Sequence, residues 1–265
     1  MIKLSEENKP LAAIVCGFPR GGTTLLSEIL RTHPKLDSGF EGGFLLVDKI
    51  SDFLELEPYN KQLKTGWKIS EKQLINICET DDYIEVYRRL VQYSLIIEQK
   101  DTWIFDKTPK YMQFLPSVLT KVPNVPCIVI VRDPRAVIWS WVKRTNLSVE
   151  EWQKKRLENN CAKYMAFVRG YKKAIRQGFG ERILLVKYEE LCLNKKEESK
   201  KIFEFIGMDW EVEQLSLNKK YPNVYGNDVS DKYLTEYKEN FSPEICEKIL
   251  NLTKPAKEWL WEGNK

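Results

Sequence analysis

The sequence predicts an α/β fold, with one domain over residues 1–265 and a central, mostly parallel sheet flanked by helices on both faces. Two observations predict this fold. Short apolar runs rich in β-branched residues alternate with longer amphipathic stretches, which is the order of a parallel sheet with crossover helices. The 265-residue chain also has 43% hydrophobic residues and no repeat or Gly/Ser-rich linker, so we expect one large core.

Four apolar runs predict the buried strands of the sheet, because strands covered on both faces are continuously apolar. They are residues 11–16, 103–105, 127–131 and 183–186. Four amphipathic stretches predict the longer helices, since their apolar residues recur at helical spacing. They are residues 24–32, 82–98, 149–177 and 197–206.

A polar cluster follows each predicted strand. The clusters are residues 17–24, 106–109, 132–135 and 187–190. In an open parallel sheet, ligands bind beyond the carboxyl ends of the strands. The sequence therefore predicts that the four clusters meet at one site.

Composition argues against nucleic acid, an anionic membrane and a metal ion as partners, and against a membrane-spanning segment. The 42 Lys and Arg against 38 Asp and Glu give a net charge of only +4, too small to indicate nucleic acid or an anionic membrane. Six scattered cysteines and one histidine make no zinc motif, so no metal site is expected. Without a secretory pattern or an apolar run of about 18 residues, we expect a cytoplasmic protein with no integral membrane segment.

The first polar cluster has the strand, glycine-rich turn and helix start of a phosphate-binding loop, which indicates a P-loop-like domain. It departs from the nucleoside-triphosphate pattern, because Thr23 stands where that pattern has lysine. Arg20 still offers a planar cation for one anionic ester. The candidate ligands of this anion are Arg20, Gly21, Gly22, Thr23 and Thr24.

The third cluster predicts a second phosphate site. Arg132 ends a strand, and Ser140 lies two turns into the helix that Pro134 is expected to begin. A guanidinium and a hydroxyl at this spacing can share one phosphate. Arg144 comes four residues after Ser140, so we expect it on the same helix face as a further ligand.

These two motifs resemble those of the PAPS-dependent sulfotransferases, where PAPS is 3′-phosphoadenosine 5′-phosphosulfate. Residues 19–25 resemble the family's 5′-phosphosulfate loop, usually Pro-(Lys/Arg)-Ser-Gly-Thr-Thr, with Gly21 at the serine position. Residues 128–140 resemble its 3′-phosphate motif. The resemblance implies in-line transfer of a sulfuryl group from PAPS to an acceptor hydroxyl or amine, with release of 3′-phosphoadenosine 5′-phosphate (PAP).

The resemblance also implies the general base. In the bacterial and Golgi-type branches, a glutamate shortly after the first helix has this role, and Glu41 stands at that distance while Phe40 replaces a second family glutamate. The rival is His33, but its Thr-His-Pro phrase is typical of a helix end, so we expect a structural role for it. The cytosolic branch uses a histidine that follows a later Lys-Thr motif. Here Lys107 and Thr108 form such a motif, but no histidine follows them.

Other family roles carry over to single positions of this sequence. Lys107 and Arg20 are expected to stabilise the leaving group, and Tyr188 resembles a residue near the adenosine. A late loop closes the 3′-phosphate site in the family, and Ser230 and Lys232 lie in the corresponding region.

Two other functions remain open from the sequence. A P-loop nucleotide-dependent kinase would use Asp106, at the end of a strand, as its magnesium ligand. A non-catalytic nucleotide-binding module would keep the phosphate sites alone. The acceptor of a sulfotransferase could be a glycan, lipid, peptide or small metabolite, and the sequence indicates neither this nor the oligomeric state.

Overall fold

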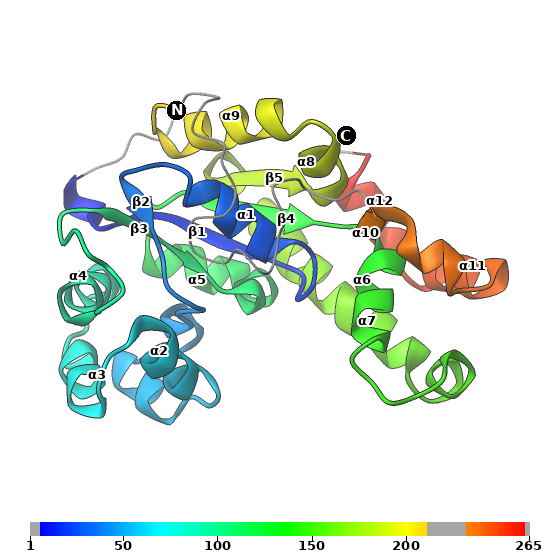
Figure 1. Cartoon of the computed structure of the whole chain (residues 1–265), viewed down its shortest axis with the longest axis horizontal. Coiled ribbons are helices and arrows are strands. Elements are labelled where there is room, and N and C mark those ends of the chain that lie inside the picture. Colours follow the sequence, from blue (N-terminus) through cyan, green and yellow to red (C-terminus); the bar gives the residue numbers. More distant parts are fainter. Residues whose placement is uncertain (1–5, 211–231, 263–265) are drawn as a thin grey trace.

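The computed structural model describes residues 6–210 and 232–262. Over these residues it has a sheet of five strands that all pair in parallel, in the order β2-β3-β1-β4-β5 (Figure 1). The four predicted strands are confirmed, and within the two described ranges the sequence left out the short edge strand β2 alone. The strands are β1 (Leu11–Gly17), β2 (Leu36–Asp37), β3 (Trp103–Lys107), β4 (Cys127–Val131) and β5 (Ile183–Lys187).

The strand order places a crevice between β1 and β4. The chain leaves β1 toward β2 and β3 on one side, whereas it leaves β4 toward β5 on the other. In parallel sheets, the loops that follow two such neighbouring strands diverge and leave room for a ligand. The loops concerned are those that follow Gly17 and Val131, which carry the two predicted phosphate sites.

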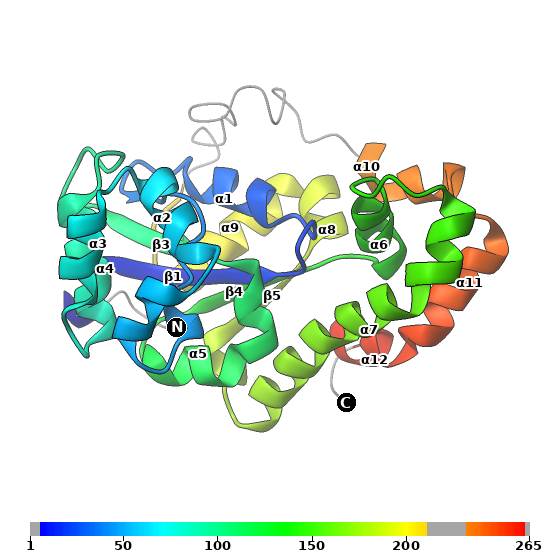
Figure 2. The ribbon, with the colours of Figure 1, turned by 90° about the horizontal axis from the view of Figure 1, so that it is seen from below.

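Helices cover both faces of the sheet, as predicted. In Figures 1 and 2, α1, α8 and α9 lie over one face, and α5 with the long α7 lies over the other. The remaining helices gather at the two ends, with α2, α3 and α4 at one and α6, α10 and α11 at the other. Bounds are α1 (Thr23–Leu30), α2 (Tyr59–Trp67), α3 (Glu71–Cys78), α4 (Tyr83–Tyr93), α5 (Leu115–Lys121), α6 (Pro134–Val142), α7 (Val149–Arg176), α8 (Tyr188–Leu193), α9 (Lys195–Ile206), α10 (Lys232–Thr235), α11 (Pro243–Leu252) and α12 (Lys254–Leu260).

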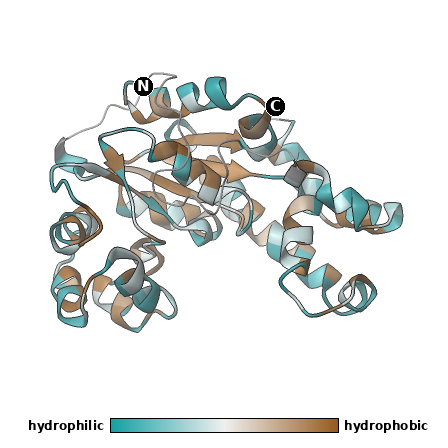
Figure 3. Cartoon of the chain, in the orientation of Figure 1, coloured by the Kyte–Doolittle hydropathy of each residue, from teal (hydrophilic) through white to brown (hydrophobic). Residues whose placement is uncertain are grey.

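The core consists of two apolar layers separated by the sheet. Along β4, Cys127, Val129 and Val131 pack into the layer beneath α5 and α7, while Ile128 and Ile130 pack against the helices of the opposite layer. This alternation follows from the period of two in a strand, and both sets are apolar because both faces are covered. Figure 3 shows the result as apolar strands surrounded by helices whose outer sides are hydrophilic.

Two helix boundaries show what the sequence pattern could and could not locate. The predicted helix 149–177 matches α7 closely, because a capping box joins Ser148 and Glu151 at its start. The predicted helix 82–98 ends early at Tyr93. There the Ser94 hydroxyl donates to the Trp67 carbonyl, a tertiary contact at 2.8 Å that the local pattern does not show.

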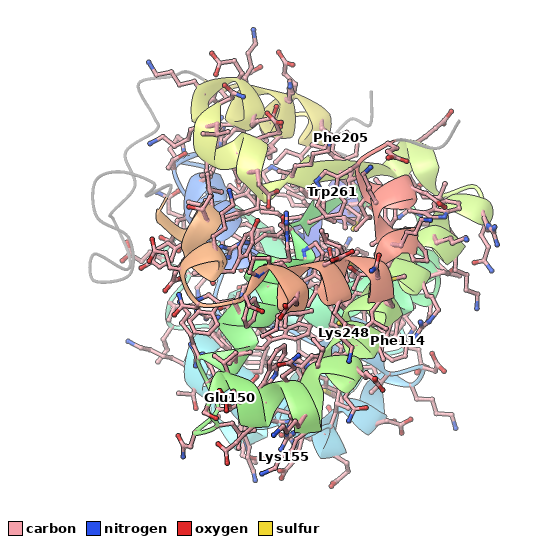
Figure 4. The ribbon with its side chains drawn as sticks, turned by 90° about the vertical axis from the view of Figure 1, so that its right-hand side faces the viewer. Phe114, Glu150, Lys155, Phe205, Lys248 and Trp261 are labelled. Carbon is pink, nitrogen blue, oxygen red and sulfur yellow. The ribbon has the colours of Figure 1, made fainter. Side chains whose placement is uncertain are left out.

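A third apolar cluster joins α6, the first half of α7 and α11 into an outer wall. Trp152 and Phe241 stack within it, with ring centroids 5.4 Å apart. Glu150 and Lys155 of α7, labelled in Figure 4, are exposed outside this cluster. Across the described ranges, no helix combines the length and the apolar character that crossing a bilayer requires.

Candidate active site

A cavity of about 720 Å³ lies at the carboxyl edge of the sheet. The loops that follow β1, β3, β4 and β5 all contribute to its wall, so the four polar clusters meet as the strand pattern predicts. Nine of the candidate residues line it: Arg20, Gly22, Thr23, Thr24, Glu41, Lys107, Arg132, Ser140 and Tyr188.

The glycine-rich loop after β1 begins α1 with an unusual backbone. Arg20 and Gly22 both have positive φ values, 68° and 106°. A Cβ atom on Gly22 would lie 2.3 Å from Cδ2 of Tyr188, so only glycine lets that ring lie against the loop. Thr23 and Thr24 follow as the first residues of α1, where free backbone N–H groups and the helix dipole favour an anion.

The predicted 3′-phosphate residues form one connected cluster with the first loop. Arg20 Nε donates to Ser140 Oγ at 3.3 Å, and Arg132 Nη1 donates to the Arg20 carbonyl at 3.2 Å. The Arg132 guanidinium also lies 4.2 Å from the ring centroid of Tyr188, and its Nη2 donates to the Tyr233 carbonyl. Its Nε is buried and has no hydrogen-bond partner among the described residues. The cluster thus holds Arg132 in place and leaves it capacity for a further acceptor.

The structure does not bring Arg144 into this cluster. The helix that carries Ser140 ends at Val142, so Arg144 lies two residues beyond the helix. Arg144 is exposed and does not line the cavity, whereas Lys143 does. Ser230 lies outside the described residues, and Lys232 is described only as the first residue of α10.

The opposite wall of the cavity carries a buried ion pair. Lys107 Nζ lies 3.3 Å from Glu41 Oε1, and these side chains are 8% and 22% exposed. Burial raises the pKa of Glu41 and the Lys107 charge only partly opposes this, while burial lowers the pKa of Lys107 against the attraction of Glu41. The pKa values of both groups are therefore shifted toward neutral pH. Such shifts are typical of groups that exchange protons at an active site.

The loop that carries Glu41 is fixed on both sides of this residue. Arg31, at the end of α1, donates through Nη2 to the Gly39 carbonyl at 3.0 Å. Trp67 Nε1 donates to the Phe40 carbonyl at 2.9 Å. The bonds leave the Glu41 carboxylate directed into the cavity, where it reaches Lys107.

Asp106, the last residue but one of β3, anchors the other side of the loop. Its carboxylate accepts from the Gly42 N–H at 3.2 Å, from the Tyr87 and Tyr111 hydroxyls at 2.6 Å each, and from Thr108 Oγ1 at 2.8 Å. Burial raises the pKa of Asp106 and these hydrogen bonds oppose the rise. Because all four donors hold this carboxylate and it does not line the cavity, it is not placed as the kinase alternative requires.

His33 lies away from the cavity wall. It is buried after the end of α1, where Nδ1 accepts from the Lys35 N–H at 3.2 Å and the ring centroid is 5.6 Å from that of Phe203. Burial lowers the pKa of His33. These contacts support the structural role expected for this histidine.

Residues 12–212 match the model of the sulfotransferase family. The chain belongs to this family. A protein-tyrosine sulfotransferase of Drosophila melanogaster is 26% identical over 199 residues, which cover 73% of this chain and 37% of the relative. A Caenorhabditis elegans protein-tyrosine sulfotransferase is 23% identical, with 81% of this chain and 53% of the relative covered. The chain thus matches about half or less of the length of these relatives.

Solved sulfotransferases share the fold of this family member. The sulfotransferase domain of the Synechococcus olefin synthase has a TM-score of 0.61 at 19% identity, covering 92% of this chain and 93% of that domain. A mouse sulfotransferase complexed with PAP has a TM-score of 0.56 at 15% identity, covering 96% and 86%. At these identities the likeness concerns the fold.

This sulfotransferase-family chain departs from the motifs it resembles at two positions that the structure explains. Gly21 stands at the serine position, and a Cβ there would lie 2.8 Å from the Phe18 carbonyl oxygen, so the local turn favours glycine. Phe40 replaces an acidic residue, and its ring centroid lies 4.8 Å from Lys107 Nζ. A ring at this distance attracts the ammonium group without neutralising it.

Several residues of the cavity wall are not among the candidates that the sequence indicates. Their positions follow from tertiary packing, although Lys143 could have been found from its spacing of three residues after Ser140. The missed residues include Phe40, Tyr59, Lys110, Gln113, Trp139, Lys143, Lys163, Phe167, Tyr233 and Glu236.

Proposed function

We propose that this family member transfers a sulfuryl group from PAPS to an acceptor hydroxyl and releases PAP. The observation that carries the proposal is that one cavity joins two anion sites to a buried carboxylate and ammonium pair. The first anion site is the glycine-rich loop, and the second is the cluster around Arg132 and Ser140. A kinase would need a lysine in the loop, but Thr23 stands at that position. It would also need a magnesium ligand, but the candidate Asp106 already accepts four hydrogen bonds.

The residues present fit a nucleotide with separate 5′ and 3′ anionic groups. Residues 20–24 would hold the 5′-phosphosulfate through backbone N–H groups and hydroxyls. Arg132 and Ser140 would hold the 3′-phosphate, since the buried Arg132 Nε still has a hydrogen to donate. Tyr188 lies between the two sites, against Gly22 and under Arg132, which supports a role beside the nucleoside.

In the proposed mechanism, the two members of the ion pair have different roles. PAPS supplies the sulfuryl group for transfer to the acceptor oxygen. Glu41 removes the proton of the acceptor hydroxyl, and its raised pKa makes it a stronger base than an exposed glutamate. Lys107 and Arg20 stabilise the negative charge that develops on the leaving oxygen. The held loop keeps Glu41 next to Lys107 throughout, because both flanking peptide groups are hydrogen-bonded.

Binding of PAP tests the proposal most directly. We expect PAP to bind at least about 10-fold more tightly than AMP, because the 3′-phosphate adds charge-assisted hydrogen bonds. Calorimetry with PAP, AMP and ATP measures this ratio.

Turnover of labelled PAPS is expected to persist in EDTA, because the mechanism assigns charge stabilisation to Arg20 and Lys107. A preference for ATP, or an absolute magnesium requirement, would favour the kinase.

The pH dependence of kcat/KM should show both members of the ion pair. Glu41 must be deprotonated to act, so activity falls as pH falls through its pKa, which burial raises above that of an ordinary glutamate. Lys107 must be protonated, so activity also falls as pH rises through its pKa, which burial lowers. We expect a bell-shaped profile whose two limbs are displaced toward each other. An acid limb at the pH of an ordinary, exposed glutamate would contradict the role of Glu41.

Two lysines of the cavity wall support an acceptor with negative charge near its hydroxyl. Lys110 and Lys163 line the same cavity, with Lys163 Nζ 4.7 Å from the ring centroid of Trp141, and Glu41 already pairs with Lys107. Several relatives are named protein-tyrosine sulfotransferases, so a tyrosine peptide is the acceptor to test first. The predicted cytoplasmic location stays a prediction.

A pair of tyrosine peptides that differ only in flanking Glu or Gln tests the charge of the acceptor. We expect a KM about 10-fold lower for the Glu peptide at low ionic strength, because the lysines attract its carboxylates. In the Lys110→Gln, Lys163→Gln double variant the difference should shrink. Equal KM values in the wild type would show that charge does not select the acceptor.

A further inference from the structure

We infer that Lys143 is a ligand of the 3′-phosphate, in the place that the sequence assigns to Arg144, and that Glu236 competes with the phosphate for it. The inference rests on the proposed function, since it concerns the same nucleotide site. It names a binding residue and an acidic group that tunes affinity, neither of which the two family motifs contain.

The first observation is where α6 ends. Ser140 is on its last turn, Val142 is its last residue, and Lys143 caps it. Lys143 still has αR backbone angles, so its side chain leaves the chain close to the helical position three residues after Ser140 and extends over the same side. Both residues are exposed, but Lys143 lines the cavity and Arg144 does not.

The second observation is that Lys143 and Arg132 meet the same short segment, residues 232–239. Lys143 Nζ lies 2.6 Å from Glu236 Oε2 and 5.6 Å from the ring centroid of Tyr233. Arg132 Nη2 donates to the carbonyl of that same Tyr233. The two cations therefore approach one region of the cavity from different helices and loops.

The third observation is the balance of charge around Ser140. Arg20, Arg132 and Lys143 line this part of the cavity, where Glu236 is the carboxylate that lines it. A phosphate monoester carries close to two negative charges at neutral pH. The excess of positive charge over Glu236 therefore suits a dianion.

The Lys143–Glu236 pair can be exchanged for a contact with phosphate. Its side chains are 36% and 21% exposed, and ion pairs with such access to water contribute little stability. A phosphate has more charge and three acceptor oxygens, so it competes well for the ammonium group. Glu236 then remains as a negative charge beside the phosphate, which weakens its binding.

Calorimetry with PAP and AMP tests the inference in four variants. Lys143→Met should weaken PAP binding about 10-fold and change AMP binding less than about twofold, because AMP lacks the 3′-phosphate. Glu236→Gln should strengthen PAP binding about threefold, because it removes a repulsive charge. Arg144→Gln tests the competing assignment, and Lys154→Gln, at an exposed position on α7, measures the effect of net charge alone.

The signs of these changes separate the inference from a structural role. If the ion pair only holds residues 232–239 in place, Lys143→Met and Glu236→Gln should both weaken PAP binding, and this result would overturn the inference. A loss confined to Arg144→Gln would also overturn it and restore the assignment from the sequence. Failure of the wild-type protein to bind PAP more tightly than AMP would instead reject the proposed function. Circular dichroism of each variant confirms that it is folded.

Discussion

Replacing Glu41 by Gln is expected to lower kcat by roughly 10²–10⁴, the usual effect of removing a positioned general base. Glutamine keeps the size of the side chain and can still accept a hydrogen bond from Lys107, which now lies 3.3 Å from Glu41 Oε1. It cannot take a proton from the acceptor. Single-turnover measurement with labelled PAPS isolates this step from product release. The acid limb of the pH profile should disappear in the same variant.

Two control measurements show whether the effect of Glu41→Gln comes from loss of the base. Affinity for PAP should stay within about twofold, because both anion sites lie in loops other than that of Glu41. His33→Asn is the matched control, since His33 is buried away from the cavity and should affect stability more than turnover. Near-wild-type turnover of Glu41→Gln with a folded but inactive His33→Asn would reverse the assignment of the base.

Replacing Arg132 by Met is expected to weaken PAP binding roughly 10–100-fold, because each charge-assisted hydrogen bond to a phosphate contributes about 1.5–3 kcal/mol. Methionine keeps much of the apolar contact with Tyr188, over whose ring the guanidinium lies at 4.2 Å. Binding of AMP should weaken much less. The ratio of the two affinities, measured by calorimetry, is therefore the diagnostic quantity.

Arg135→Met provides the matched control for Arg132→Met. Arg135 lies three residues further along the chain, but it pairs with Asp133 at 2.6 Å and does not line the cavity. Its loss should leave the PAP to AMP ratio unchanged. Arg132 also donates to the Arg20 and Tyr233 carbonyls, so some stability is lost with it. Equal weakening of PAP and AMP would mean that Arg132 supports the cavity without recognising the 3′-phosphate.

The elements that the sequence located share a local cause. The four predicted strands are apolar because helices cover both faces of the sheet. Strands β1 and β4 are fully buried, whereas the edge strand β5 is mostly half-buried. The phosphate loop is readable because Gly22 needs a positive φ and a close approach that other residues do not allow. Strand β2 was missed since its two residues are too few to show any period.

The structure places Arg144 and Asp106 differently from what their local sequence pattern indicates. The spacing of Ser140 and Arg144 is helical in the sequence, but α6 stops at Val142 and turns Arg144 out to solvent. Asp106 shows the same limit in another form. Its position at a strand end fits a metal ligand, yet Tyr87 of α4 and Tyr111, which follows β3, hold its carboxylate inside the core.

The sequence by itself determined the fold class and the loops that carry the site, because strand periodicity, glycine turns and parallel order are local or one-dimensional properties. Only the tertiary structure decided which charges face one another across the cavity. The pairing of Glu41 with Lys107 and of Lys143 with Glu236 joins residues 66 and 93 positions apart. Such pairs depend on how loops and helix ends pack, and their burial sets the pKa of Glu41 that the proposed chemistry uses.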